Sequence, residues 1–186
     1  MKGRNVRERI YLTGEELDRM ELDIMNRRHI ERYGIIRQYC SGVVMDVACG
    51  CGYGSYLISK NPDVEDVIAF DQEQEAIEWA QVNFGHGKVQ FKQSTIKQFN
   101  MEADMVVAFE IIEHLHKPKQ LIDLIERSNA IKALISFPTK KTTHYNPHHY
   151  HDFDKCDIIG MFSREWREKD FIELHREHGI LWMERD

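Results

Sequence analysis

The feature that most constrains the fold is the apolar run at residues 43–47 and the glycine-rich turn that follows it. The run is apolar except for Asp46, and glycines then alternate at Gly50, Gly52 and Gly54. In α/β proteins, a buried strand, a glycine turn and a helix N-terminus together form a site for a nucleotide-like ligand. Glycines permit positive φ angles and let a ligand approach the backbone without meeting a Cβ atom.

The spacing of this turn differs from that of a dinucleotide site, whose fingerprint reads G-x-G-x-x-G. Here the three glycines are each separated by one residue, and Asp46 stands four residues before the first. A carboxylate near the turn disfavours a pyrophosphate, because like charges repel, and suits a ligand with a positive charge. On this motif alone, a tight turn in some other α/β protein is the alternative.

Strand and helix patterns alternate through the rest of the chain. Apolar runs predict five strands, at residues 43–47, 67–71, 89–93, 105–109 and 133–137. Helices are predicted at residues 52–60, 74–84, 118–128 and 158–166. Two short β patterns, at 171–175 and 180–183, predict a terminal antiparallel hairpin. This alternation implies a parallel sheet with right-handed crossovers.

The N-terminal segment, residues 1–42, is expected to be helical. Thr13 and Glu16 have the spacing of a capping box, and apolar residues follow at helical spacing. The apolar stripe changes phase between Ile24 and Ile30, which favours two helices over one long helix.

Length and composition bound the class of protein. The 186 residues fit a single domain, 1–186, with the helical segment 1–42 before an α/β core at 43–186. The net charge of −6 argues against a general nucleic-acid or membrane-surface binder. No apolar run could span a bilayer and no signal core follows the N-terminus, so a cytoplasmic protein is expected. The four cysteines form no C-x-x-C pair and are expected to be reduced thiols.

Residues 46–54 resemble the first motif of class I S-adenosylmethionine (SAM) dependent methyltransferases, D-x-G-x-G-x-G. Ala48 stands where the first glycine usually sits, and alanine is the smallest replacement. The order of elements from about residue 28 to the end also resembles that family. The resemblance implies an α/β fold: a single Rossmann-like class I methyltransferase domain with a mostly parallel seven-stranded sheet and a C-terminal antiparallel hairpin.

Ligands of such sheets bind at the carboxyl ends of the strands, which selects the residues expected to hold SAM. Asp71 closes the second strand, where the family carries an acidic residue that can accept both ribose hydroxyls. Ser94 follows the third strand, where many members have Asp near the adenine; a plain turn serine is the alternative. His29, Arg32 and Tyr33 resemble a stretch that folds over the cofactor, with a solvated helix face as the alternative. The expected cofactor-binding residues are Asp46, Ala48, Cys49, Gly50, Gly52, Tyr53, Gly54, Asp71, Gln72, Ser94, Thr95 and Glu110.

Two clusters carry groups suited to chemistry. After the fourth strand, Glu110, Glu113 and His114 lie in a stretch that resembles the E-V-I-E-H-L signature of small-molecule methyltransferases. After the fifth strand, four histidines fall within residues 144–151. That loop resembles the N-P-x-H-x-x-E-F element of methyltransferases acting on sugars and related metabolites. His149 matches its histidine, and Asp152-Phe153 match its acidic-aromatic pair, with Asp in place of Glu.

Two mechanisms fit these clusters. In the first, His149 or His114 takes the proton of a substrate hydroxyl as the methyl group transfers, with Glu113 as the third catalytic residue. In the second, Mg²⁺ or Mn²⁺ binds Glu110, Glu113, His114 and His149 and lowers the pKa of the hydroxyl. The E-x-x-E-H spacing with a later histidine resembles the metal site of small-RNA 2′-O-methyltransferases, and quinone O-methyltransferases carry a similar stretch. The alternative to both is a set of solvated loop histidines.

The sequence therefore predicts a SAM-dependent methyltransferase whose acceptor is a small hydroxylated metabolite such as a sugar or nucleotide-sugar. The alternatives are an RNA 2′-O-methyltransferase, a quinone-type O-methyltransferase with a divalent metal, and a non-catalytic SAM-binding partner subunit. The acidic charge disfavours a nucleic-acid substrate without excluding it. Because no insertion is long enough to form a lid, we expect either a second protomer, as in a homodimer, or a large substrate to cover the site.

Overall fold

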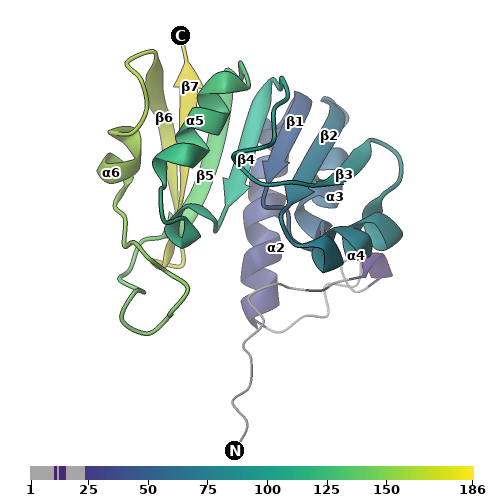
Figure 1. Ribbon diagram of the computed structural model, residues 1–186, viewed down its shortest axis with the longest axis horizontal. Helices are drawn as coiled ribbons and strands as arrows, with labels where there is room; N and C mark the ends of the chain where they lie inside the picture. The colour runs from purple at the N-terminus through teal and green to yellow at the C-terminus, as the bar shows by residue number, and fades with distance from the viewer. Residues whose placement is uncertain (1–10, 12, 16–23) are drawn as a thin grey trace, which may run out of the picture.

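The computed structural model describes residues 11, 13–15 and 24–186, and one mixed β-sheet forms its centre. The strands lie in the order β3-β2-β1-β4-β5-β7-β6. Their bounds are β1 Gly42–Val47, β2 Val64–Asp71, β3 Val89–Gln93, β4 Met105–Phe109, β5 Lys132–Pro138, β6 Trp166–Leu174 and β7 His178–Arg185. The first five strands pair in parallel, whereas β7 is antiparallel to both β5 and β6. This confirms the expected seven-stranded, mostly parallel sheet with a terminal hairpin, which lies at the edge opposite β3 (Figure 1).

Helices cover the two faces of the sheet through two apolar cores. The helices are α2 Ile24–Ile36, α3 Tyr53–Ser59, α4 Gln74–Phe84, α5 Lys119–Arg127 and α6 Lys155–Ile159, with short 3₁₀ turns η1 Arg37–Tyr39 and η2 Ile112–His114. One core contains side chains of α2, α3 and α4, and the other contains those of α5 and α6. Successive side chains of a strand point to opposite faces. Accordingly, Val44 of β1 belongs to the first core, and Met45 and Val47 belong to the second.

The strand order determines where a ligand can bind. The chain runs outward from β1 to β3 and then returns to β4, which pairs with the other side of β1. Open α/β sheets bind ligands at such a reversal, beyond the carboxyl ends of the strands. Asp46 of β1 is in register with Ala69 of β2 and Val107 of β4, so the turns after these three strands meet. In Figure 1 the arrowheads of β1 and β4 point to the lower edge, where the green loop after β5 also lies.

The expected helix over residues 158–166 is wrong in both position and length. The observed helix, α6, begins earlier because Asp154 forms a capping box with Asp157, in which the side chain of each accepts a backbone N–H of the other. Trp166 instead begins β6 and buries its ring in the second core, with 5% of the residue exposed. The predicted hairpin is therefore longer than the two apolar patterns indicated.

The predicted capping box at Thr13 falls mostly outside the described residues. The structure describes a helical backbone at Gly14 and Glu15, but residues 16–23 lie outside its described part, so the expected pair of helices stays a prediction. The four cysteines are all free thiols, as expected, and three of them are buried. Among the residues that the structure describes, no helix is both long and apolar enough to span a bilayer.

Candidate active site

The glycine turn after β1 adopts backbone conformations that explain its composition. Gly50 and Gly52 have φ angles of 54° and 85°, and Ala48 also has a positive φ, 56°. A Cβ atom at Gly52 would lie 2.6 Å from the ring of Phe91 and 2.7 Å from the Cβ of Ala80, so only glycine fits there. Ala48 adopts the left-handed conformation at a cost of about 1–2 kcal/mol, which a glycine at this position would avoid.

Asp46 lies beneath the turn and is fully buried. Its carboxylate accepts hydrogen bonds from the Ser55 hydroxyl at 2.6 Å and the Tyr33 hydroxyl at 3.3 Å. Burial raises the pKa of Asp46 to about 7, and these two hydrogen bonds oppose the shift. Asp46 therefore links β1, α2 and α3 below the ligand site rather than forming its wall.

Asp71 ends β2 and holds the turn from the other side. Its Oδ2 atom accepts a hydrogen bond from the backbone N–H of Gly50 at 3.0 Å, and its Oδ1 atom accepts one from the N–H of Glu73 at 2.9 Å. The Cys49 N–H also donates to the Phe70 carbonyl. The carboxylate thus lies between the glycine turn and the start of α4.

A cleft follows the carboxyl ends of the central strands and consists of two adjoining cavities of about 330 and 560 Å³. Six residues line both cavities: Ala48, Asp71, Gln72, Ile111, His114 and Tyr150. The smaller cavity is also lined by α2, through His29, Arg32 and Tyr33, and by Glu110 after β4. The residues of the glycine turn and the start of α3 that line it are Cys49, Gly50, Cys51 and Tyr53. The larger cavity extends past Ser94 and Thr95 after β3. Of the expected cofactor residues, Asp46, Gly52 and Gly54 lie outside the lining of both cavities.

Glu110 occupies a strained position at the end of β4, with a φ angle of 51°. Its Oε1 atom accepts a hydrogen bond from Ser136 at 2.8 Å, and its Oε2 atom lies 3.1 Å from His178 Nδ1 and 3.7 Å from Arg32 Nη2. Burial alone would raise the pKa of Glu110, but the close approach of His178 and the charge of Arg32 outweigh it and hold the pKa below its usual range. Glu110 is therefore an anion paired with α2 and β7.

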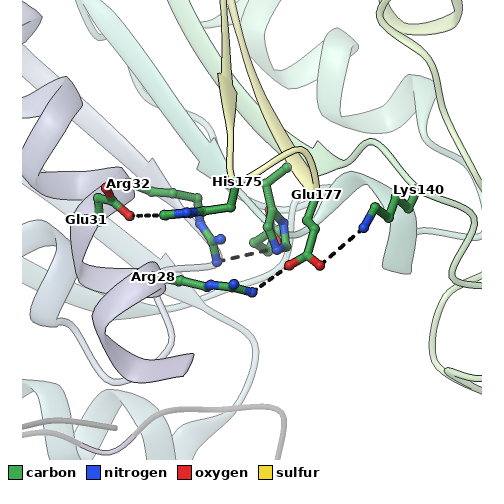
Figure 2. A network of polar contacts seen from close by, with 8 residues as sticks. Arg28, Glu31, Arg32, Lys140, His175 and Glu177 are labelled. Atoms are coloured by element: carbon green, nitrogen blue, oxygen red, sulfur yellow. Dashed lines mark hydrogen bonds and ion pairs between the residues drawn. The ribbon is translucent and has the colours of Figure 1, made fainter. Parts of the chain in front are cut away.

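Ion pairs extend this connection between α2 and the turn that joins β6 to β7 (Figure 2). Arg28 pairs with Glu177 at 2.5 Å, Lys140 pairs with the same carboxylate at 3.2 Å, and His175 lies 2.5 Å from Glu31. Arg28 and Glu31 of α2 thus contact the turn that joins β6 to β7. Because α2 carries one wall of the cleft, the hairpin contributes to the shape of the ligand site.

The groups suited to catalysis meet where η2 contacts the loop after β5. Glu113, His114 and His149 each offer one ligand atom, and these atoms lie within 4.8 Å of one another. The rings of His114 and His149 meet edge to face, with centroids 4.5 Å apart. The Tyr150 N–H donates to the Glu113 carbonyl and fixes the loop against η2. Glu110, which the sequence places with these residues, is not part of this group.

His114 is the member of this group that faces the cleft, since it lines both cavities. Its Nδ1 atom lies 3.0 Å from the His148 carbonyl oxygen, and a carbonyl can only accept, so Nδ1 carries the hydrogen. The neutral ring then has its lone pair on Nε2. His149 lines neither cavity, and its Nδ1 atom lies 2.6 Å from the Thr142 hydroxyl oxygen.

Several residues of this site could not be identified from the sequence around them. His178 begins β7 and Ser136 lies within β5, and both reach Glu110 only through the sheet topology. Thr142 reads as an ordinary loop residue, yet it is buried against His149. Arg32 was expected near the cofactor, but its almost complete burial, with 2% exposed, could not be foreseen.

Comparisons with known proteins identify the family and the fold. A family described as "Methyltransferase domain" matches residues 41–161. No curated protein matches the chain. The magnesium protoporphyrin IX methyltransferase ChlM of Synechocystis PCC 6803, with bound S-adenosylhomocysteine (SAH), has a similar structure: TM-score 0.73, 15% identity, covering 95% of this chain and 97% of that one.

Two further solved structures share the fold. The N-methyltransferase NodS of Bradyrhizobium japonicum WM9, in complex with SAH, has a TM-score of 0.70 at 14% identity, covering 90% of each chain. The methyltransferase domain of bacterial CtHen1-C has a TM-score of 0.64 at 14% identity, covering 88% of this chain and 99% of that one. The family match spans more than half of the chain, and the described fold is the one these methyltransferases share. The chain therefore belongs to the class I SAM-dependent methyltransferases.

Proposed function

We propose that the protein transfers the methyl group of SAM to a hydroxyl of a small metabolite, with a sugar or nucleotide-sugar as the first candidate. The observation that carries the proposal is the position of His114. This imidazole lines the cleft beside the glycine turn, and its hydrogen bond to a carbonyl leaves Nε2 as the basic nitrogen. A base in that place suits an acceptor that loses a proton, as a hydroxyl does.

The two cavities suit the two halves of SAM. The smaller one would take the methionine part, because the buried guanidinium of Arg32 on its wall is a partner for a carboxylate. Asp71, which lines both cavities, would accept the ribose hydroxyls. The larger cavity would take the adenine between Ser94, Thr95 and the residues after η2. This arrangement directs the sulfonium methyl toward the end of β4.

The reaction then follows from the positions of these groups. The acceptor oxygen attacks the methyl carbon in line, the bond from that carbon to sulfur breaks, and the sulfonium becomes the neutral thioether of SAH. The hydroxyl proton passes to His114 Nε2, and the His148 carbonyl stabilises the resulting imidazolium through Nδ1–H. The protein contributes orientation and a positioned base, and general-base catalysis alone accounts for about 10²- to 10⁴-fold.

A divalent metal is the second candidate mechanism, favoured by the close approach of Glu113, His114 and His149. A carboxylate with two imidazoles suits Mn²⁺ better than Mg²⁺, which prefers oxygen ligands. Because Glu110 is paired elsewhere, the ligand set would be three residues rather than the four that the sequence indicates. A bound metal would lower the pKa of the acceptor hydroxyl. The same cluster speaks against a non-catalytic SAM-binding subunit, which would not need it.

A methyl-transfer screen with and without chelator tests the proposal. Labelled SAM would be offered with sugars, nucleotide-sugars, quinols and short RNA, before and after treatment with EDTA. We expect transfer to a hydroxylated sugar that survives EDTA, because His114 acts as a base without a metal. Loss of transfer on chelation, restored by Mn²⁺, would favour the metal mechanism. Transfer only to an amine or to RNA would overturn the proposed acceptor class.

Asp46 is expected to couple SAM binding to the release of a proton. With its pKa raised to about 7 by burial, the carboxyl is partly protonated at neutral pH in the unliganded protein. SAM brings positive charge on its sulfonium and ammonium groups, which favours the ionised carboxylate. Affinity for SAM should increase between about pH 6 and 8, by about tenfold if binding lowers the pKa by one unit. Calorimetry at several pH values measures this, and a flat profile in the wild type would contradict it.

Ionisation of Asp46 is expected to lower the stability of the unliganded protein, although it raises the affinity for SAM. A carboxyl whose pKa is higher in the folded than in the unfolded chain reduces the free energy of unfolding as pH rises from about 4 to about 7. Asp46→Asn removes this loss, so the unliganded variant should be more stable than the wild type at about pH 8, by on the order of 2 kcal/mol. It should also lose the pH dependence of SAM affinity. Urea unfolding of both proteins at about pH 5 and 8 provides the comparison.

A further inference from the structure

We infer that Thr142 and Asp152 are positioning residues that fix the tautomer of His149, with hydrogen on Nδ1 and the lone pair on Nε2. The tautomer itself is argued from the contacts of the loop. Only the role of His149 beside His114 in catalysis rests on the proposed function. The inference concerns a contact that the loop makes within itself: Thr142 precedes His149 by seven residues, and its hydroxyl oxygen lies 2.6 Å from His149 Nδ1.

A hydroxyl alone does not decide a tautomer, because it can donate to the ring nitrogen or accept from it. His114 differs in this respect, since its Nδ1 partner is a carbonyl oxygen that can only accept. The direction of the bond between Thr142 and His149 is therefore set by what else the Thr142 hydroxyl contacts. The second contact is with Asp152, whose Oδ1 atom lies 3.4 Å from the hydroxyl oxygen.

Asp152 is held as an anion by the loop around it. Its carboxylate accepts hydrogen bonds from the Thr143 hydroxyl at 2.6 Å, the Thr142 N–H at 2.6 Å and the Thr143 N–H at 3.1 Å. These bonds, that of the Thr143 hydroxyl first, lower the pKa of Asp152 to about 2. An ionised carboxylate has no hydrogen to donate, so every contact it makes orients a donor toward it.

The charge of Asp152 therefore draws the single hydrogen of the Thr142 hydroxyl. The oxygen of that hydroxyl is then left to accept from His149 Nδ1–H, and the hydrogen-bonded chain runs from His149 through Thr142 to Asp152. This direction places the lone pair of His149 on Nε2, as the His148 carbonyl does for His114. Two basic imidazole nitrogens then accompany the Glu113 carboxylate, an arrangement suited to holding a proton or a divalent cation between them.

Nitrogen-15 NMR tests the inference without any methyl acceptor. Correlations between the ring hydrogens and ring nitrogens distinguish the two neutral tautomers in histidine-labelled protein saturated with SAH and treated with EDTA. The His149 signals are assigned as those lost in His149→Gln. We expect the wild type to show the Nδ1–H form at a pH where the ring is neutral. A wild-type ring with hydrogen on Nε2 would overturn the inference, whatever the variants do.

Variants separate positioning from general loop structure. Thr142→Val keeps the shape of the side chain but removes the hydroxyl, and we expect most of the Nδ1–H population to be lost. Thr142→Ser should restore it. Thr143→Val is the matched control, because the Thr143 hydroxyl bonds to the other oxygen of the same carboxylate, Oδ2. A Thr142→Val spectrum equal to that of the wild type, or an equal change in Thr143→Val, would contradict the assignment.

The functional consequence is measured once an acceptor is known. Thr142→Val should lower kcat at least tenfold with little change in KM or in SAM affinity, and Thr142→Ser should recover most of the loss. If the expected tautomer is observed but His114 and His149 variants retain full transfer, the proposed function fails while the tautomer assignment stands. If Thr142→Val does not fold, the wild-type and Thr142→Ser spectra still decide the inference.

Discussion

Replacing His114 with asparagine is expected to slow methyl transfer by about 10²- to 10⁴-fold, the usual range for loss of a general base. The asparagine amide can still donate to the His148 carbonyl, which His114 Nδ1 now contacts at 3.0 Å, but it has no basic nitrogen. SAM affinity should change less than about threefold. The measurement is transfer of labelled methyl to the acceptor found in the screen, together with calorimetry of SAM binding.

The neighbouring histidines provide the controls. His144→Asn should transfer at the wild-type rate, because His144 lies in the same loop but is exposed and outside the cluster. His149→Ala should lower transfer less than His114→Asn if His114 is the base. Equal and complete losses in both variants, together with loss on chelation, would show that the two rings act as metal ligands. Full activity in His114→Asn would contradict both mechanisms.

Asp71→Asn should weaken the binding of SAM and SAH alike, by roughly 30-fold or more. The carboxylate accepts backbone N–H groups of Gly50 and Glu73, and an amide oxygen can replace only one of its two oxygens as an acceptor. Hydrogen bonds to a charged group contribute about 1.5–3 kcal/mol each, and 1.4 kcal/mol corresponds to tenfold in affinity. The variant therefore loses the proposed acceptor of the ribose hydroxyls, and the glycine turn loses a backbone hydrogen bond.

Asp66→Asn is the matched control for Asp71. It removes an acid from the same strand, but Asp66 is exposed and does not line the cleft. Its SAM affinity should equal that of the wild type. Thermal unfolding of both variants checks that the fold is retained, because Asp71 also holds the start of α4. Wild-type SAM affinity in Asp71→Asn would show that SAM does not lie along the end of β2.

The central strands could be predicted from the sequence because a buried parallel strand is a nearly continuous apolar run. The five predicted parallel strands all occur, although β2 begins earlier, at Val64. Asp71 could also be placed, since it directly follows such a run. The helix expected over residues 158–166 failed because a local signal, the Asp154 capping box, started a short helix and tertiary burial drew Trp166 into the sheet.

The contacts of the site residues could not be predicted from the sequence, because they depend on the order of the strands in the sheet. Glu110 and His178 are separated by 68 positions and meet only because β7 inserts next to β5. Glu110 thus contacts His178 and Arg32 and is not part of the predicted metal cluster. The contact of Thr142 with His149 depends on the path of the loop after β5. The spacing of apolar residues does not predict the path of a loop.

Titration of the purified wild-type protein with SAM and with SAH in a calorimeter tests the central claim most directly. The cleft, whose two cavities are both lined by Asp71, should bind both ligands at one site per chain. The affinity for SAM should increase with pH as Asp46 ionises. Absence of heat with either ligand, over the pH range in which the protein is folded, would contradict the account.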